Sequence, residues 1–167
     1  VHSFCHCLPN TWHHMSVMLS ATNCINWFSK IHNIKIQDAI NKAKKFYNEN
    51  FISKSTPFFL PYLSGERTPY NNPYLRGSFH NLNTSTSIES MLYAVIEGVC
   101  FGIKDGYNAV HSVSPKSKDI YFVGIDGIVG QVEQHLLDIR RIGEYETGRG
   151  KRLECQSNIF ADLGTLF

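Results

Sequence analysis

The order of apolar and polar residues predicts alternating strands and helices along most of the chain. Residues 1–7 alternate loosely between apolar and polar side chains, which is typical of a short strand that ends before Pro9. Over residues 12–31 the apolar side chains form one broad helical stripe, which predicts a long buried helix. A second helix is predicted over residues 36–48, because its apolar residues share one face and its lysines lie on the other.

The middle of the chain predicts a strand, an irregular segment and a third helix. Residues 58–60 are a compact apolar run and predict a buried strand, whereas three prolines and a glycine between residues 61 and 73 exclude regular structure there. The sequence Thr86-Ser-Ile-Glu89 has the spacing of a capping box and predicts a helix that continues to about Val110. Glycines along this helix predict close approach of other segments, and they are Gly98, Gly102 and Gly106.

A last strand is predicted over residues 120–123, followed by the turn Gly124-Ile-Asp-Gly127 and a helix to about Ile139. In an α/β fold, such a strand–turn–helix unit is where backbone amides can bind a phosphate or a nucleotide. Most such turns are plain connections, so both interpretations stay open. Strands that alternate with long helices place the chain in the α/β class.

Composition adds little to this picture. The chain has 167 residues, 43% of them apolar and 18% charged, which is typical of one folded globular domain. The net charge of +2 and the lack of a long apolar run give no indication of a nucleic-acid or membrane partner. The chain does not begin with Met, which we interpret as a piece of something longer. The basic residues of the tail are interpreted as solvated surface; they are Arg140, Arg141, Arg149, Lys151 and Arg152.

The five cysteines, an odd number without a secretory signal, indicate reduced thiols in a cytoplasmic protein. Cys24 and Cys100 lie in apolar stretches and are predicted to be core residues. A group of possible metal ligands stands near the N-terminus, but its spacing fits no zinc site, so ordinary packing is the preferred interpretation and no metal ligand is assigned. This group contains Cys5, His6, Cys7, His13 and His14.

The most unusual segment is the loop Leu63-Ser-Gly-Glu-Arg-Thr-Pro69. Its side chains can donate and accept hydrogen bonds and form ion pairs, on a backbone restricted by proline, and such loops often form functional sites. A structural loop in which Glu66 and Arg67 pair with neighbours explains the same residues equally well. The candidate residues are Ser64, Gly65, Glu66, Arg67, Thr68 and Pro69. The spacing supports no Ser-His-Asp or Cys-His arrangement and no pair of catalytic carboxylates.

Several segments resemble the C-terminal domain of xylulokinases, which are FGGY carbohydrate kinases. They are Val1-His-Ser-Phe-Cys-His6, Trp12-His13, Met15-Ser-Val-Met-Leu-Ser20, Phe59-Leu-Pro-Tyr-Leu-Ser-Gly-Glu-Arg-Thr-Pro69, Asn71-Asn-Pro73, Arg76-Gly77, Ala94-Val-Ile-Glu-Gly98, Phe101-Gly102 and Asp105-Gly106. The resemblance implies the actin-like, ribonuclease-H-like α/β fold, with residues 1–124 as a partial C-terminal domain. Residues 125–167 are then a divergent tail, for which a shifted reading frame is one hypothesis.

The resemblance also implies a function. Xylulokinases use ATP and Mg²⁺ to phosphorylate D-xylulose to xylulose 5-phosphate. Their first domain binds the sugar, an aspartate near the domain junction is the general base, and the second domain binds the nucleotide. Because this chain resembles the second domain, we expect the catalytic aspartate and the sugar pocket outside it, and the isolated chain to be inactive. The alternatives are a non-catalytic remnant without nucleotide binding, a kinase for a related sugar or polyol, and a small metal-binding module. A homodimer of the parent enzyme is left open.

By the same resemblance, the nucleotide contacts correspond to Thr22, Ile25 and Asn26 in one helix, and to Gly124 and Gly127 in the predicted turn. The Asn26 amide can hydrogen-bond a nucleotide or simply lie on the helix surface. The chain departs from the family pattern at five places. In the turn, Ile125 and Asp126 replace glycines and Gly127 replaces an alanine. Elsewhere, Asn81 replaces a glycine and Ser90 replaces a polar amide or an acid.

Overall fold

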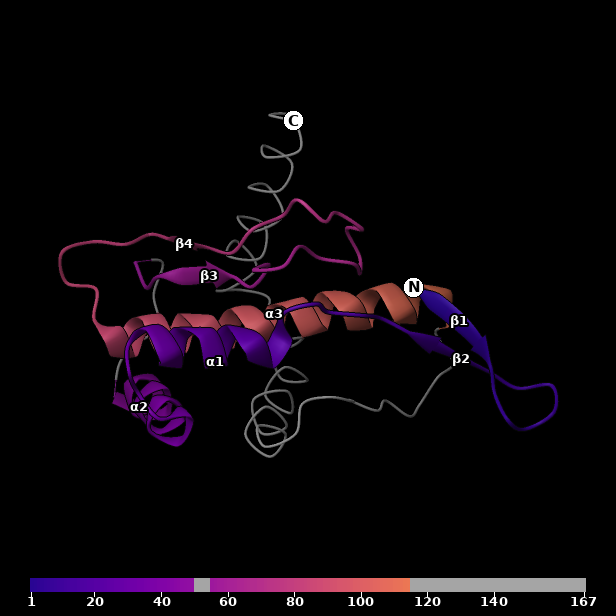
Figure 1. Ribbon diagram of the computed structural model, residues 1–167, viewed down its shortest axis with the longest axis horizontal. Helices are drawn as coiled ribbons and strands as arrows, with labels where there is room; N and C mark the ends of the chain where they lie inside the picture. The colour runs from indigo at the N-terminus through magenta and orange to yellow at the C-terminus, as the bar shows by residue number, and fades with distance from the viewer. Residues whose placement is uncertain (50–54, 115–167) are drawn as a thin grey trace. The chain divides into compact units, whose positions relative to one another are not determined.

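The computed structural model describes residues 1–49 and 55–114 (Figure 1). All of them belong to the first of two units, Val1–Ile128. The elements in chain order are β1 (His2–Cys5), β2 (Trp12–Met15), α1 (Ala21–Ile31), α2 (Ile36–Glu49), β3 (Phe58–Leu60), β4 (Ser78–His80) and α3 (Ile88–Val113). The strand predicted over 120–123, the turn with Gly124, Ile125, Asp126 and Gly127, and the tail all lie outside the described residues.

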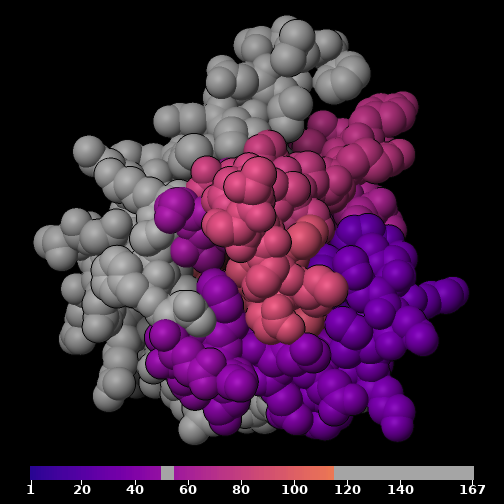
Figure 2. All heavy atoms as spheres, turned by 90° about the vertical axis from the view of Figure 1, so that its left-hand side faces the viewer, coloured from indigo at the N-terminus to yellow at the C-terminus, as the bar shows by residue number. Residues whose placement is uncertain are grey.

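Helix α3 is the element around which the described residues pack. It contacts α1, α2 and β3, and Figure 1 shows β3 with β4 on one side of it and α2 on the other. Leu92, Val95 and Val99 on its apolar face are each at most 2% exposed, whereas Ile103 is half-buried. Figure 2 shows the end of this arrangement, where side chains of α2 lie against the first turns of α3.

Two antiparallel pairs of strands complete the described architecture. In the first pair His2 lies opposite Met15 and Cys5 opposite Trp12. In the second, Phe59 lies opposite Phe79, and their rings are 4.6 Å apart between centroids. Strand β4 was not predicted from the sequence. It has only three residues, too few for an alternating pattern to be recognised.

The glycines of α3 allow close approach, as predicted. A Cβ at Gly98 would overlap the carbonyl oxygen of Phe59 in β3. A Cβ at Gly102 would lie 2.7 Å from Met18 Cε, and one at Gly106 would lie 2.7 Å from Ser16 Oγ. The strand β3 and the segment before α1 therefore pack against the helix backbone itself.

The helix predicted over residues 12–31 is wrong in its first half. Trp12–Met15 forms strand β2, and the helix begins only at Ala21. Tertiary contacts explain the difference, because residues 12–15 pair with β1 and Met18 packs against Gly102 of α3. Pairing between strands overrides a local apolar stripe that also suits a helix.

The other predicted elements agree with the structure more closely. Helix α2 ends one residue beyond the prediction, at Glu49, although Ile36 is 43% exposed rather than inward-facing. Residues 58–60 form β3 as predicted.

Cys24 and Cys100 are buried, and burial raises the pKa of both thiols to about 12. None of the helices in the described part of the chain has the length and apolar character needed to cross a bilayer.

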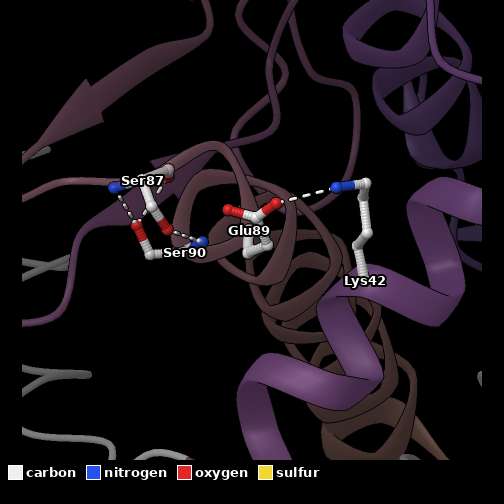
Figure 3. A network of polar contacts seen from close by, with 4 residues as sticks. All are labelled: Lys42, Ser87, Glu89 and Ser90. Atoms are coloured by element: carbon white, nitrogen blue, oxygen red, sulfur yellow. Dashed lines mark hydrogen bonds and ion pairs between the residues drawn. The ribbon is translucent and has the colours of Figure 1, made fainter.

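The capping box of α3 lies one residue later than predicted (Figure 3). Ser87 is the N-cap, and its Oγ accepts a hydrogen bond from Ser90 N at 3.2 Å. Ser90 Oγ in turn accepts from Ser87 N at 3.1 Å. Glu89 instead points towards α2, where its Oε1 lies 2.8 Å from Lys42 Nζ. Ser90 thus performs the capping role usual for a longer amide or acid at this position.

Candidate functional site

The unusual loop runs alongside the segment that leads into α1. Ser64 N donates to Ser20 Oγ at 3.1 Å, and Leu19 N donates to Glu66 Oε1 at 3.2 Å. Thr68 is bonded twice to Val17, because its N donates to the Val17 carbonyl and its Oγ1 accepts from Val17 N, both at 3.1 Å. Residues 64–68 and 17–20 therefore run antiparallel and hold each other.

The loop also holds its own shape. Glu66 N donates to the Asn72 carbonyl at 2.9 Å, and Asn72 N donates to the Glu66 carbonyl at 2.8 Å. Gly65 has a φ of +80°, in the region that favours glycine, and a Cβ there would lie 2.8 Å from Pro73 Cα. Backbone hydrogen bonds and the glycine conformation therefore fix the shape of the loop, in addition to its side-chain contacts.

Glu66 is the buried carboxylate of this loop. Its side chain is 2% exposed, and its Oε1 accepts from Arg67 N at 2.7 Å as well as from Leu19 N. Its Oε2 is buried and has no hydrogen-bond partner among the described residues. Burial raises the pKa of the carboxyl, and the backbone donors, with Arg67 first, oppose this shift. Arg67 is exposed and forms no ion pair in the described part of the chain. Glu66 thus pairs with backbone amides as in the structural interpretation of the loop, whereas the Arg67 side chain has no ion-pair partner among the described residues.

A second polar chain connects the loop to α3. Tyr70 Oη donates to Asp105 Oδ2 at 3.1 Å, and Tyr62 and Tyr70 are also hydrogen-bonded to each other. Burial raises the pKa of Tyr70 to about 12 and also raises those of Tyr62 and Asp105. These groups therefore stay protonated more readily than free side chains, which suits a structural network more than proton transfer at neutral pH.

Helix α1 contains three of the predicted nucleotide contacts, and two of them are accessible at the surface. Asn26 is exposed and Thr22 is half-buried, one turn apart on the helix. Ile25 is 1% exposed and packs in the core, so its side chain is not available to a ligand in this structure. Trp27 is half-buried and stacks on Phe59, with ring centroids 6.0 Å apart. The helix thus exposes the Asn26 amide and partly exposes the Thr22 hydroxyl.

The start of α1 is unusual. Ser20 is its N-cap residue, but its side chain forms no capping hydrogen bond, because Oγ accepts from Ser64 N instead. The hydroxyl that would normally bond to the first turn holds the loop. The position of the helix start consequently depends on residues 64–68.

Comparison with known proteins places this geometry in a family. Residues 1–131 match the FGGY family of carbohydrate kinases, C-terminal domain. The chain belongs to this family. The xylulose kinases of Escherichia coli (strain K12) and Klebsiella pneumoniae are each 40% identical to it over 149 residues. That alignment covers 89% of this chain and 30% of each relative, so the chain spans less than a third of their length.

A solved structure agrees with this assignment. The crystal structure of a xyloylose kinase from Brucella ovis is 42% identical, with a TM-score of 0.61. The match covers 68% of this chain and 22% of that one. The expected actin-like fold class is thereby confirmed for this FGGY kinase segment.

In this FGGY kinase segment, the histidines and cysteines near the N-terminus form local contacts. Ser3 Oγ lies 2.8 Å from His14 Nδ1, and His13 stacks on Phe4 at 5.4 Å between centroids. Cys7 Sγ lies 3.5 Å from His6 Nδ1. No group of three or more His, Cys, Asp or Glu side chains within residues 1–49 and 55–114 is placed to hold a metal ion.

Sequence reasoning found the loop but not its partners. Val17, Leu19 and Ser20 lie 44 to 51 residues from the loop positions they bond. The apolar stripe over residues 12–31 predicts a helix for all three, so nothing in the local pattern indicates their role. The hydrogen bond between Tyr70 and Asp105, 35 residues apart, likewise had no signal in the local sequence pattern.

Proposed function

We propose that this chain is the nucleotide-side part of a xylulokinase, which transfers the γ-phosphoryl group of ATP to D-xylulose and yields xylulose 5-phosphate. The observation that carries the proposal is the 40% identity to two xylulose kinases over 149 residues. Sugar recognition and the general base would come from the remainder of such an enzyme. In phosphoryl transfer, a protein contributes mainly positioning and charge stabilisation.

The residues of α1 fit a role in binding the nucleotide. Thr22 and Asn26 offer a hydroxyl and a carboxamide on an accessible face, and such groups can donate to and accept from a base or a ribose. Ile25 supports this face from the core. Gly124 and Gly127 remain a proposed second contact, outside the described residues.

Mg²⁺ would accompany the nucleotide rather than occupy a site made by these residues. The described part of the chain places no three acidic or imidazole groups together. Mg²⁺ is commonly bound through substrate phosphates, water and one or two carboxylates, so this is compatible with a metal held mainly by ATP.

ATP binding by the purified chain tests the nucleotide part of the proposal. At an ATP·Mg²⁺ concentration of 100 times Kd, binding adds about 2.7 kcal/mol to the free energy of unfolding, measured by thermal denaturation. We expect Asn26→Ala to reduce this stabilisation. The control is Asn48→Ala, which removes an exposed amide from α2 and should keep it. No stabilisation of the unsubstituted chain would favour the alternative of a non-catalytic remnant.

The sugar part requires the rest of an enzyme. Residues 1–131 of this chain can replace the matching segment of the Escherichia coli xylulose kinase, and the chimera can be assayed for ATP-dependent phosphorylation of D-xylulose. We expect activity from the chimera and none from the 167-residue chain alone. A folded chimera that binds ATP but leaves D-xylulose unphosphorylated would contradict the proposal.

A further inference from the structure

A buried carboxylate needs an explanation, because burial of a charge is unfavourable unless hydrogen bonds compensate for it. Glu66 is 2% exposed, and one of its two oxygens carries the bonds from Leu19 N and Arg67 N. Hydrogen bonds to a charged acceptor are stronger than those between neutral groups. Leu19 stands directly before the N-cap of α1, so the carboxylate acts at the point where the chain enters that helix.

The geometry points to Glu66 as a positioning residue that fixes the start of α1, and with it Thr22 and Asn26. This inference rests on the proposed nucleotide-binding function of α1. Glu66 itself would touch neither nucleotide nor sugar. Its effect would pass through the backbone amide of Leu19 to the helix.

Three observations support this role. The N-cap side chain of α1 forms no capping hydrogen bond, so the entry of the chain into the helix is set by the bonds of residues 17–20 to the loop. Glu66 is itself held rigid, because its N and carbonyl oxygen both bond to Asn72. Thr68 holds Val17 two residues further back, so the segment is fixed at successive points along its length.

Removal of the Glu66 side chain leaves the amides of Leu19 and Arg67 without this acceptor. A buried donor without an acceptor is unfavourable, so the segment should open locally. In Glu66→Gln an amide oxygen can still accept both hydrogen bonds. Rescue by Gln therefore separates acceptor geometry from a need for charge.

Hydrogen exchange on the full chain tests the inference. In Glu66→Ala we expect the amides of residues 19–24 to exchange about tenfold faster than in the wild type. The exchange rates of α2 should stay unchanged. Glu66→Gln should restore exchange to near the wild-type rate. The matched control is Glu89→Ala, which removes an exposed carboxylate from the start of α3 and should not affect residues 19–24. Unchanged exchange of these residues in folded Glu66→Ala would overturn the inference.

ATP affinity supplies the second readout. For Glu66→Ala we expect Kd for ATP·Mg²⁺ to rise about fivefold or more, and Glu66→Gln to stay close to wild type. If exchange rises while the Kd of a binding-competent chain is unchanged, Glu66 does not position the nucleotide contacts. If the wild-type chain binds no ATP, the proposed function fails, whereas hydrogen exchange still decides whether Glu66 fixes α1.

If Glu66→Ala does not fold, Glu66→Asp can take its place in the exchange experiment. Glu66→Asp keeps the carboxylate but shortens its reach by one methylene, so the bond to Leu19 N should lengthen or break. We expect faster exchange at residues 19–24 in this variant as well. Wild-type exchange there in both Glu66→Asp and Glu66→Gln would contradict the inference.

Discussion

Asn81 adopts a φ of +62°, a backbone conformation that glycine adopts freely and asparagine tolerates better than most other residues. Its Nδ2 also donates to the Thr56 carbonyl at 3.3 Å, which ties this position to the segment before β3. The family pattern implied by the resemblance has glycine here, and asparagine is compatible with a backbone conformation that suits glycine. The asparagine side chain also forms a hydrogen bond that glycine cannot form.

At the residue scale, His80 is also expected to make the free energy of unfolding depend on pH. Its ring stacks on Phe58 at 4.9 Å, its Nε2 lies 2.8 Å from Ser78 Oγ, and burial lowers its pKa. The unfolded chain therefore binds this proton more readily, so the free energy of unfolding should decrease as the pH falls below about 6.5. In His80→Phe this decrease should be smaller, as measured by urea unfolding at several pH values.

The control for this measurement is His111→Phe, which replaces an exposed histidine that stacks on Tyr107. We expect this variant to keep the wild-type slope of stability against pH. An identical slope in wild type and His80→Phe would show that His80 does not contribute to it.

At the scale of elements, the start of α3 combines a capping box with an ion pair to α2 (Figure 3). The side chains of Lys42 and Glu89 are 46% and 39% exposed, so solvent screens their attraction. Ser87 satisfies a backbone N–H at the helix terminus, which contributes more. The cap should therefore matter more to stability than the ion pair.

Two substitutions compare these contributions. Ser87→Ala should lower the free energy of unfolding by about 1 kcal/mol. Lys42→Met, which removes the charge but keeps most of the stem, should change it by about 0.5 kcal/mol or less. Denaturant unfolding of both variants gives the two values under the same conditions. A larger loss in Lys42→Met than in Ser87→Ala would reverse this ranking.

At the scale of the whole molecule, the contact between α3 and β3 joins the helices to the strands. Gly98→Ala should destabilise this contact by about 1–3 kcal/mol, because the new methyl group would overlap the Phe59 carbonyl and force the backbones apart. The gain in helix propensity, about 1 kcal/mol, offsets only part of this cost. Thermal or urea unfolding measures the net change.

Gly106→Ala is the matched control for this contact. Its new methyl group would meet Ser16 Oγ, the end of a side chain that can rotate away. We expect a net change near zero, because the propensity gain compensates for the adjustment. Equal losses in the two variants would mean that the Phe59 carbonyl is not the limiting contact.

The sequence alone predicted those elements whose structure is determined by their own pattern of apolar and polar residues. Helix α2 has a clear polar face, and Phe58–Leu60 is short and wholly apolar, so both were predicted nearly to the residue. Residues 12–20 were assigned to a helix because their stripe suits one, whereas pairing with β1 and contact with α3 decide their structure. The polar residues and prolines of residues 63–69 located the candidate loop, but only the structure shows that Glu66 bonds to Leu19, 47 residues away.

The use of the Ser20 hydroxyl has a consequence for the order of folding. An 11-residue helix without a side-chain cap is marginal by itself, since nucleation is unfavourable and each terminal N–H left unbonded adds to the cost. Its start is instead stabilised by a tertiary hydrogen bond between the Ser20 hydroxyl and Ser64, 44 residues away. Helix α1 should therefore gain its native protection only after this long loop has closed, which delays its formation relative to α3, whose cap is local.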